Sequence, residues 1–177
     1  AIGTRAQTGA NAGVTIITDS QDVESTAEVA DSMKMRFQNG WDLVKGDGDD
    51  NSDGVNFRIR QASGNTTDGA AATIQTIAIP ADSTVMIKSK IVGVRTGGTA
   101  GNVADSAAYE KTSVFKNIGG VVTVSKKQSD YTFEDQASWE SNHDVSGTDA
   151  IISVTGAANN DVRWHVTSYV QIVSHLV

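Results

Sequence analysis

The chain has 177 residues, with 21 acidic and 14 basic side chains, a formal net charge of −7 and no cysteine. An acidic surface repels phosphate backbones, so we expect no nucleic-acid partner, and without cysteine no disulfide can staple the fold. No apolar run reaches the roughly 18 residues of a membrane span, so no membrane insertion is expected. The 17 glycines, the single proline and the many Thr, Val and Ile residues are typical of an all-β domain with tight turns.

Residues 1–19 are predicted to form short strands punctuated by glycine, as an N-terminal oligomerisation or attachment segment. Residues 1–3 (Ala-Ile-Gly) and 13–18 (Gly-Val-Thr-Ile-Ile-Thr) are spaced like two rungs of one β-roll. A single rung cannot bury its apolar face alone, so Ile2, Val14 and Ile16 would need partner chains. The alternative is a plain N-terminal strand that pairs with the main sheet.

Residues 20–54 are predicted to be a connector. Its first part, 20–38, is the one candidate helix, because Val23, Ala27, Ala30 and Phe37 fall near one helical face. Acidic residues lie early in this segment and basic residues late, as the helix dipole favours. An acidic loop follows at 45–54.

The acidic loop is the best candidate for a cation site. Asp49, Asn51 and Asp53, followed by glycine, match the opening of the calcium-loop pattern, in which alternating oxygens surround a hard cation. Asp47 could supply a further oxygen. The pattern then fails, because Arg60 stands where a bidentate glutamate belongs. Ca²⁺ binding and an ordinary solvated loop both remain open, and no other cofactor is expected.

Residues 55–177 are predicted to form a knob domain of alternating strands. We expect strands at 55–61, 72–79, 84–95, 110–118, 120–126, 130–134, 149–155 and 162–174. Their number and turns predict an all-β, two-sheet antiparallel sandwich, jelly-roll-like, with the short β-roll or arm at the N-terminus.

Alternation along these strands predicts the core. Phe57, Trp164, Val166 and Val170 should be buried together between the two sheets. The strand at 84–95 places apolar residues on both faces, so a β-bulge is expected near Ile91.

No catalytic constellation is evident. The three histidines, at positions 143, 165 and 175, accompany neither a nucleophile elbow nor a cysteine nucleophile. Glu134, Asp135 and Glu140 are candidates for a carboxylate pair by residue type only, and turn formation around Trp139 is the simpler interpretation. We therefore expect a binding or assembly protein and not an enzyme.

Four short motifs resemble a known module. They are Ile79-Pro-Ala-Asp-Ser-Thr, Ala107-Ala-Tyr-Glu, Glu134-Asp-Gln-Ala-Ser-Trp, and Val154-Thr-Gly-Ala followed by Val162-Arg-Trp. Together they make 66–173 similar to a C-terminal module of tailed-bacteriophage virion proteins, found on fibres, spikes and appendages. Residues 1–14 resemble the A-I-G repeat of trimeric β-roll heads in adhesins and phage fibres.

The resemblance implies a virion protein, assembled in the bacterial host cytoplasm, that forms a homotrimer and contacts other virion proteins. A reducing cytoplasm suits a chain without cysteine. One hypothesis is a fibre or appendage tip that binds a host surface glycan or protein. The other is a capsid decoration, cement or adaptor subunit that stabilises the particle. Whether residue 1 begins the mature protein or lies inside a longer chain stays open.

If the chain is a tip, loops at one end of the sandwich should contact the host, because loops carry variable specificity on a rigid frame. The predicted loops are 63–68, 96–105 and 141–148. The candidate receptor-binding residues within them are Asn102, Asp105, Asn142 and His143.

Overall fold

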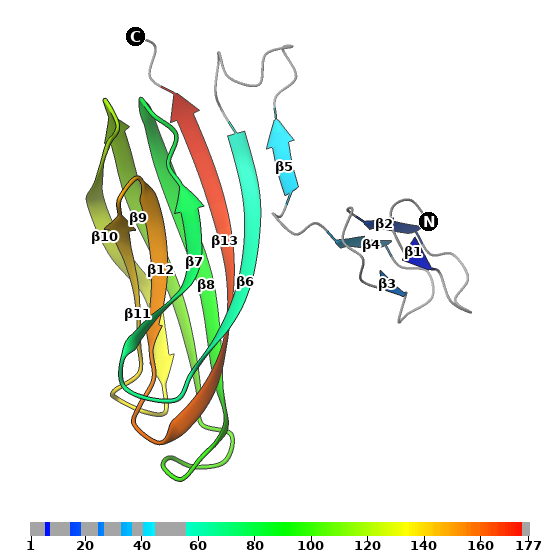
Figure 1. The fold of residues 1–177 in the computed structure, drawn as a ribbon, viewed down its shortest axis with the longest axis vertical. Coiled ribbons are helices and arrows are strands. Elements are labelled where there is room, and N and C mark those ends of the chain that lie inside the picture. The colour runs from blue at the N-terminus through cyan, green and yellow to red at the C-terminus, as the bar shows by residue number, and fades with distance from the viewer. Residues whose placement is uncertain are drawn as a thin grey trace. The chain divides into compact units, whose positions relative to one another are not determined.

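The computed structural model describes residues 6–7, 15–18, 25–26, 33–36, 41–44 and 56–174. The chain divides into two compact units, Ala1–Trp41 and Asp42–Val177. Every regular element of the described residues is a β-strand, and none is a helix (Figure 1). The expected all-β class is therefore confirmed.

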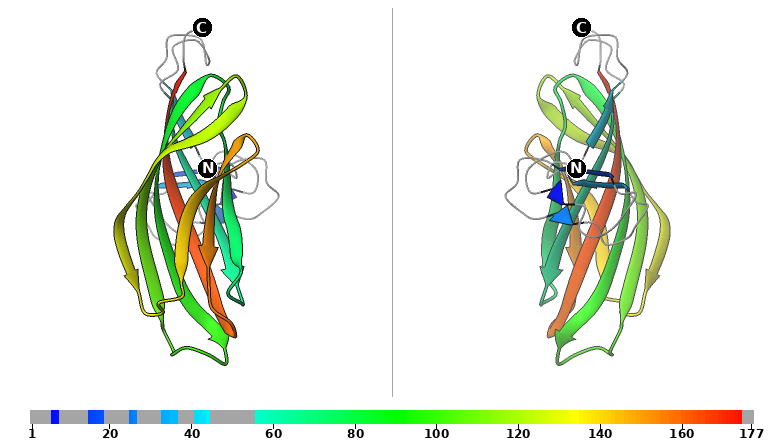
Figure 2. Two further views of the ribbon diagram at one scale, coloured as in Figure 1. Left: turned by 90° about the vertical axis from the view of Figure 1, so that its left-hand side faces the viewer. Right: turned by 90° about the vertical axis from the view of Figure 1, so that its right-hand side faces the viewer.

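The larger unit is the expected sandwich of two antiparallel sheets, whose long strands twist along their length (Figure 2). The large sheet has the order β10-β9-β8-β13-β6, with β5 (Trp41–Val44) beside β6, and the small sheet has the order β11-β12-β7. The bounds are β6 Asn56–Thr66, β7 Ala71–Ala78, β8 Ser83–Gly98, β9 Ser106–Ile118, β10 Val121–Glu134, β11 Glu140–Ser146, β12 Asp149–Thr155 and β13 Asn160–Ser174.

Two strands differ from the prediction. The strands expected at 120–126 and 130–134 are one strand, β10, which pairs with β9 along its whole length and absorbs two register shifts. Strand β11 was expected to be a loop, because its sequence is polar. Its inward residues Ser141 and His143 are nevertheless buried, and they contribute hydroxyl and imidazole groups to the core.

The core is centred on β13, and three of its four predicted members are confirmed. Trp164, Val166 and Val170 are fully buried. Phe57 is not among them, because the residues of β6 predicted to face the core face outward. The register pairs Phe57 with Gln171 on the outer face of the large sheet. Residues directly opposite each other in an antiparallel pair share a face. Phe57 therefore stacks on the half-buried Tyr169, with ring centroids 6.2 Å apart.

The bulge expected near Ile91 is also wrong. Strand β8 pairs with β9 without any register shift, so its alternation continues unbroken past Ile91. Val92 and Val94 consequently lie on the outer face, where they are 55% and 41% exposed. The register shift that β8 does contain lies further along, opposite Asp161 and Val162, where Thr96 is the extra residue.

The smaller unit contains two parallel strand pairs. Strand β1 (Ala6–Gln7) pairs with β3 (Ser25–Thr26), and β2 (Thr15–Thr18) pairs with β4 (Met33–Arg36). Partner residues in the two pairs are 19 and 18 positions apart. The repeat is therefore longer than predicted, since two rungs were expected within residues 1–19.

The helix expected at 20–38 is wrong where the chain is described, because β3 and β4 satisfy their backbone groups by pairing. Ile16 is fully buried within one chain, so the expectation that it needs partner chains is also wrong. Ile2 and Val14 lie outside the described residues.

Candidate binding groove at the loop end of the sandwich

One end of the sandwich, the lower end in Figure 1, carries four connections, and we call it the loop end. They are the β6–β7 turn, the β8–β9 loop, the β10–β11 connection and the β12–β13 turn. Ala100 N donates to Asn159 O at 2.9 Å, which joins the loop to the last turn. A Cβ atom on Gly156 would lie 2.4 Å from Thr66 Oγ1, so the β12–β13 turn also packs closely against the end of β6.

Two of the three predicted contact loops, 63–68 and 96–105, meet at the loop end. The third, 141–148, does not, because most of it is strand β11. Its turn lies at the opposite end of the sandwich, where Ile79 N donates to Thr148 O at 3.2 Å. The expectation that all three segments form one binding surface is therefore wrong for the third.

The β8–β9 loop is held in place by two charged side chains. The Arg95 guanidinium donates to Ala100 O at 2.8 Å and to Gly98 O at 2.6 Å. Asp105 Oδ2 accepts from Asn102 N at 2.7 Å and from Gln136 Nε2 at 2.6 Å. The backbone N–H of Asn102 contributes most to lowering the pKa of Asp105, because it stabilises the charged carboxylate.

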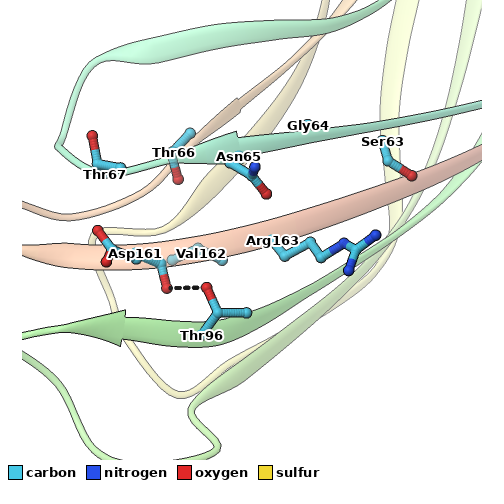
Figure 3. Close-up of a pocket in the computed structure, with 9 residues that line it drawn as sticks. All are labelled: Ser63, Gly64, Asn65, Thr66, Thr67, Thr96, Asp161, Val162 and Arg163. Atoms are coloured by element: carbon cyan, nitrogen blue, oxygen red, sulfur yellow. Dashed lines mark hydrogen bonds between the residues drawn. The ribbon is translucent and has the colours of Figure 1, made fainter.

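Beside this loop, the outer face of the large sheet is hollowed into a groove of about 500 Å³ (Figure 3). The ends of β6 and β8 and the start of β13 form its walls. Its lining is mostly hydroxyl, amide and charged side chains, with one valine. The lining residues are Ser63, Gly64, Asn65, Thr66, Thr67, Thr96, Asp161, Val162 and Arg163.

The β-bulge at Thr96 shapes this groove. The extra residue lets Thr96 Oγ1 donate to Asp161 O at 3.3 Å, as the dashed line in Figure 3 shows. Gly97 lies directly beside the Asp161 carboxylate, since a Cβ atom there would lie 2.9 Å from Asp161 Oδ2. Bulges of this kind redirect side chains at the end of a strand, and here the bulge positions a carboxylate in the groove.

A serine–histidine pair lies on β6 and β13 at the groove. Ser63 Oγ is 3.0 Å from His165 Nδ1, and the other ring nitrogen, Nε2, is 3.5 Å from Thr167 Oγ1. In a hydrolytic triad a carboxylate would hold that second nitrogen. The groove thus offers hydrogen-bond donors and acceptors on an open surface, an arrangement suited to binding a polar ligand.

The four predicted receptor-binding residues are not brought together. Asn102 is exposed at the loop end but does not line the groove, and Asn142 is half-buried on β11. Asp105 is 7% exposed and braces its loop, while His143 is 1% exposed and lies 2.9 Å from Ser113 Oγ through Nδ1. The assumption that Asp105 and His143 are exposed loop residues is wrong.

Sequence reasoning missed Asp161 and Arg163 as groove residues. The alternation of β13 was an available signal for Arg163, whereas no sequence pattern marked the bulge that brings Thr96 and Asp161 together. Asn65 and Thr96 fell inside predicted contact loops without being singled out.

The predicted calcium ligands Asp47, Asp49, Asn51 and Asp53 lie outside the described residues. Within the part of the chain that the structure describes, no three His, Asp or Glu side chains gather as metal ligands would. The same part of the chain has no helix long and apolar enough to cross a membrane.

No protein-family model matches the chain, and no curated protein matches it. Among solved structures it is similar to the tailspike protein of Acinetobacter baumannii bacteriophage Fri1, a capsular polysaccharide depolymerase, and to the tailspike protein of Acinetobacter baumannii phage AM24. Each match has a TM-score of 0.36 and 12% sequence identity over 67% of this chain. The chain spans 19% and 26% of those two proteins, so the matches do not bear on its activity.

Proposed function

We propose that this chain is a bacteriophage virion protein, namely a trimeric fibre or appendage tip domain that binds a host surface component without catalysing a reaction. The observation that carries the proposal is the polar groove at the loop end. Its walls are strand ends fixed by sheet hydrogen bonds, and its lining is mostly polar and charged. A rigid frame that presents polar groups at its loop end is typical of recognition proteins.

The motifs shared with phage virion proteins mostly build the frame of the sandwich. In the first motif, Ser83 Oγ donates to Pro80 O at 2.6 Å, and Asp82 Oδ1 accepts from Gly119 N at 3.0 Å. In the third motif, Asp135 Oδ2 accepts from Ser106 N at 2.9 Å. These bonds stabilise the turns of the sandwich. Apart from Val162 and Arg163, the groove residues lie outside the motifs. Ligand specificity could therefore change at the groove while the motif residues keep the sandwich intact.

The chemistry of the groove favours a host glycan over a host protein. Protein interfaces depend on buried apolar and aromatic anchors, and the groove has only Val162. Hydroxyl-rich chains can instead exchange hydrogen bonds with Asn65, Asp161 and Arg163.

A binding assay with the purified, fluorescently labelled chain on a panel of bacterial strains tests the proposal. Changing Asn65, Asp161 and Arg163 together to alanine should abolish binding to any strain that the native chain labels. The matched control changes Lys116 and Thr123 to alanine, since both are exposed on the same sheet near its other end. Equal binding by the groove variant, or no labelled strain at all, would contradict the proposal.

The proposed homotrimer is tested by light scattering. A chain of 18.5 kDa should give three times that mass at micromolar concentration. A monomeric mass would remove the trimer from the proposal without affecting the groove.

A second candidate function is a capsid decoration or cement subunit, and the outer face of the large sheet favours it. Val92, Ala108 and Phe133 occupy one row across β8, β9 and β10, and Val92 and Phe133 are 55% and 44% exposed. Apolar patches of this kind mark contacts with other proteins. Band intensity on a gel of purified virions separates the two functions, because a decoration subunit is abundant and a tip is scarce.

A further inference from the structure

The exposed apolar side chains of the sandwich gather on one face. Within residues 56–174, nine large hydrophobic side chains are exposed, and eight of them lie on the outer face of the large sheet. The ninth, Val103, is in the β8–β9 loop, so none lies on the small sheet of the same described range. Single exposed apolar residues need no explanation, but a one-sided distribution indicates a contact surface. Four of the eight lie away from the loop end, namely Met86, Ile118, Val121 and Val173.

The other four form one patch nearer the loop end, together with an alanine. Val92 on β8 is opposite Ala108 on β9, and Ala108 is opposite Phe133 on β10. Tyr131 precedes Phe133 on the same side of β10 and is 56% exposed, and Val94 follows Val92 on β8. Opposite side chains have Cβ atoms about 5 Å apart, so these groups form a continuous surface, which we call the outer apolar patch. It shares no residue with the lining of the groove.

Charged groups of both signs lie next to the outer apolar patch. Lys90 is opposite Glu110, and Glu110 also forms an ion pair with Lys88. On the same face, Asp130 Oδ2 accepts from Thr112 Oγ1 at 2.5 Å. A surface of a single sign would repel its own copy, whereas this surface can offer a lysine to a carboxylate of a second copy and the reverse.

The size of the face also suits a second copy. Five strands about 4.8 Å apart, with roughly a dozen residues each, present on the order of 1,000 Å². A stable protein interface buries about 800 Å² on each partner, and its centre is enriched in aromatic side chains such as those of Tyr131 and Phe133. A single small ligand would leave most of the eight apolar side chains exposed to water.

We propose that a second copy of this chain covers the outer apolar patch, so that the outer faces of the large sheets form the contact between copies. The inference rests on the proposed homotrimer and names the surface that builds it. Each copy supplies Val92, Tyr131 and Phe133 to the contact. Val94 is opposite Arg163 in the register, so the groove of each copy borders this contact.

Light scattering on a charged variant tests the inference. Val92→Lys and Phe133→Lys, combined in one full-length chain, should lower the mass at micromolar concentration threefold, to the 18.5 kDa of one copy. Both residues are exposed in a single copy, so the variant should keep the far-UV circular dichroism of the native chain. The matched control combines Thr76→Lys and Ser146→Lys, which add the same charge at exposed positions of the small sheet and should keep the native mass.

A single introduced thiol gives a second readout that does not depend on the charged variant. The chain has no cysteine, so the thiol of Val92→Cys is the only one present. A maleimide should alkylate it about tenfold more slowly in the assembled chain than in a chain diluted until it is monomeric, because only the dissociated fraction exposes it. Thr76→Cys is the control and should react equally fast at both concentrations.

The outcomes separate this inference from the proposed function. A native chain of monomeric mass would overturn the inference and remove the trimer, while strain binding still tests the groove. A trimer that persists in the lysine variant, with Val92→Cys as reactive as Thr76→Cys, would overturn the inference alone. A native dimer that the lysine variant separates would support the contact surface and contradict the threefold assembly.

Discussion

Two layers of the sandwich core share strands β9 and β13 but differ in kind. Near the loop end the layer is aromatic: Trp164 packs edge-on against Trp139 at 5.5 Å and stacks with Tyr109 at 6.4 Å. Midway along the strands the layer is polar, with three hydrogen bonds between buried side chains, of which the first lies within the large sheet and the other two join the sheets. Those bonds are Ser89–Ser168 at 2.7 Å, Ser168–Gln75 at 2.6 Å and His143–Ser113 at 2.9 Å.

The two layers place different demands on the fold. The aromatic layer is stabilised by the apolar area that its side chains bury. The polar layer depends on hydrogen bonds whose loss would leave buried groups unpaired. Slipping a strand by one residue would turn Ser168 away from Gln75 and expose the apolar set, so the polar layer helps to fix the alignment of the sheets. The aromatic layer should therefore contribute most of the stability, and the polar layer should fix the register of the strands.

The largest effect is expected from truncating the aromatic layer. Trp164→Ala should lower the free energy of unfolding by about 3–5 kcal/mol, because it leaves a large cavity against Trp139 and Tyr109. Urea denaturation followed by far-UV circular dichroism measures this. Trp164→Phe is the control, since it keeps a ring in place and should cost less. A loss below about 1 kcal/mol for the alanine variant would contradict the dominant role of this layer.

Overpacking the same layer is expected to cost nearly as much. A Cβ atom on Gly93 would lie 2.3 Å from a ring carbon of Trp164, so Gly93→Ala must displace the indole. We expect a loss of about 3 kcal/mol, at the upper end for an added methyl group in a packed core. Gly69→Ala is the matched control, because a Cβ atom there would meet nothing within 4 Å. Equal stability of the two variants would show that the indole moves freely.

The polar layer should make the free energy of unfolding depend on pH. Burial is the main cause that lowers the pKa of His143 to about 4, and the charges of Lys111 and Lys127 act in the same direction. In the unfolded chain the pKa is about 6.5, so between these values the unfolded state binds the extra proton. Stability should be unaffected above pH 6.5 and fall by about 3 kcal/mol as the pH drops to 4.

Unfolding free energies measured at several pH values between 4 and 7.5 check this. His143→Gln removes the titrating group while offering Ser113 a hydrogen-bonding side chain, so its stability should vary less with pH over this range. His165→Gln, on the exposed face of β13, is the control for the substitution itself. The same slope in the native chain and in His143→Gln would assign acid sensitivity to other groups.

The sequence predicted the sandwich and most of its strands, because alternation in β13 and the glycine turns are local signals. It could not predict the polar layer. Ser141 and His143 look like loop residues until the burial of β11 is known, and only His143 has a hydrogen-bonding partner on the opposite sheet, Ser113. Alternation also indicated the wrong face of β6, since Phe57 and Ile59 are the apolar set at its start. The register with β13 instead places Ala62, Gly64 and Thr66 opposite buried residues. The groove was missed in part for the same reason: Thr96 and Asp161 meet only through a bulge.

The smallest effect is expected outside both layers, at the aromatic pair on the outer face. Phe57→Ala should cost only about 1 kcal/mol, because the ring is half-buried and its main aromatic contact is Tyr169. A double-mutant cycle with Tyr169→Ala should give a coupling of about 0.5–1.5 kcal/mol between the two rings. A loss as large as that of Trp164→Ala would mean that Phe57 belongs to the core after all. A coupling near zero would mean instead that the two rings are independent, and that β6 is held by its backbone pairing with β13 alone.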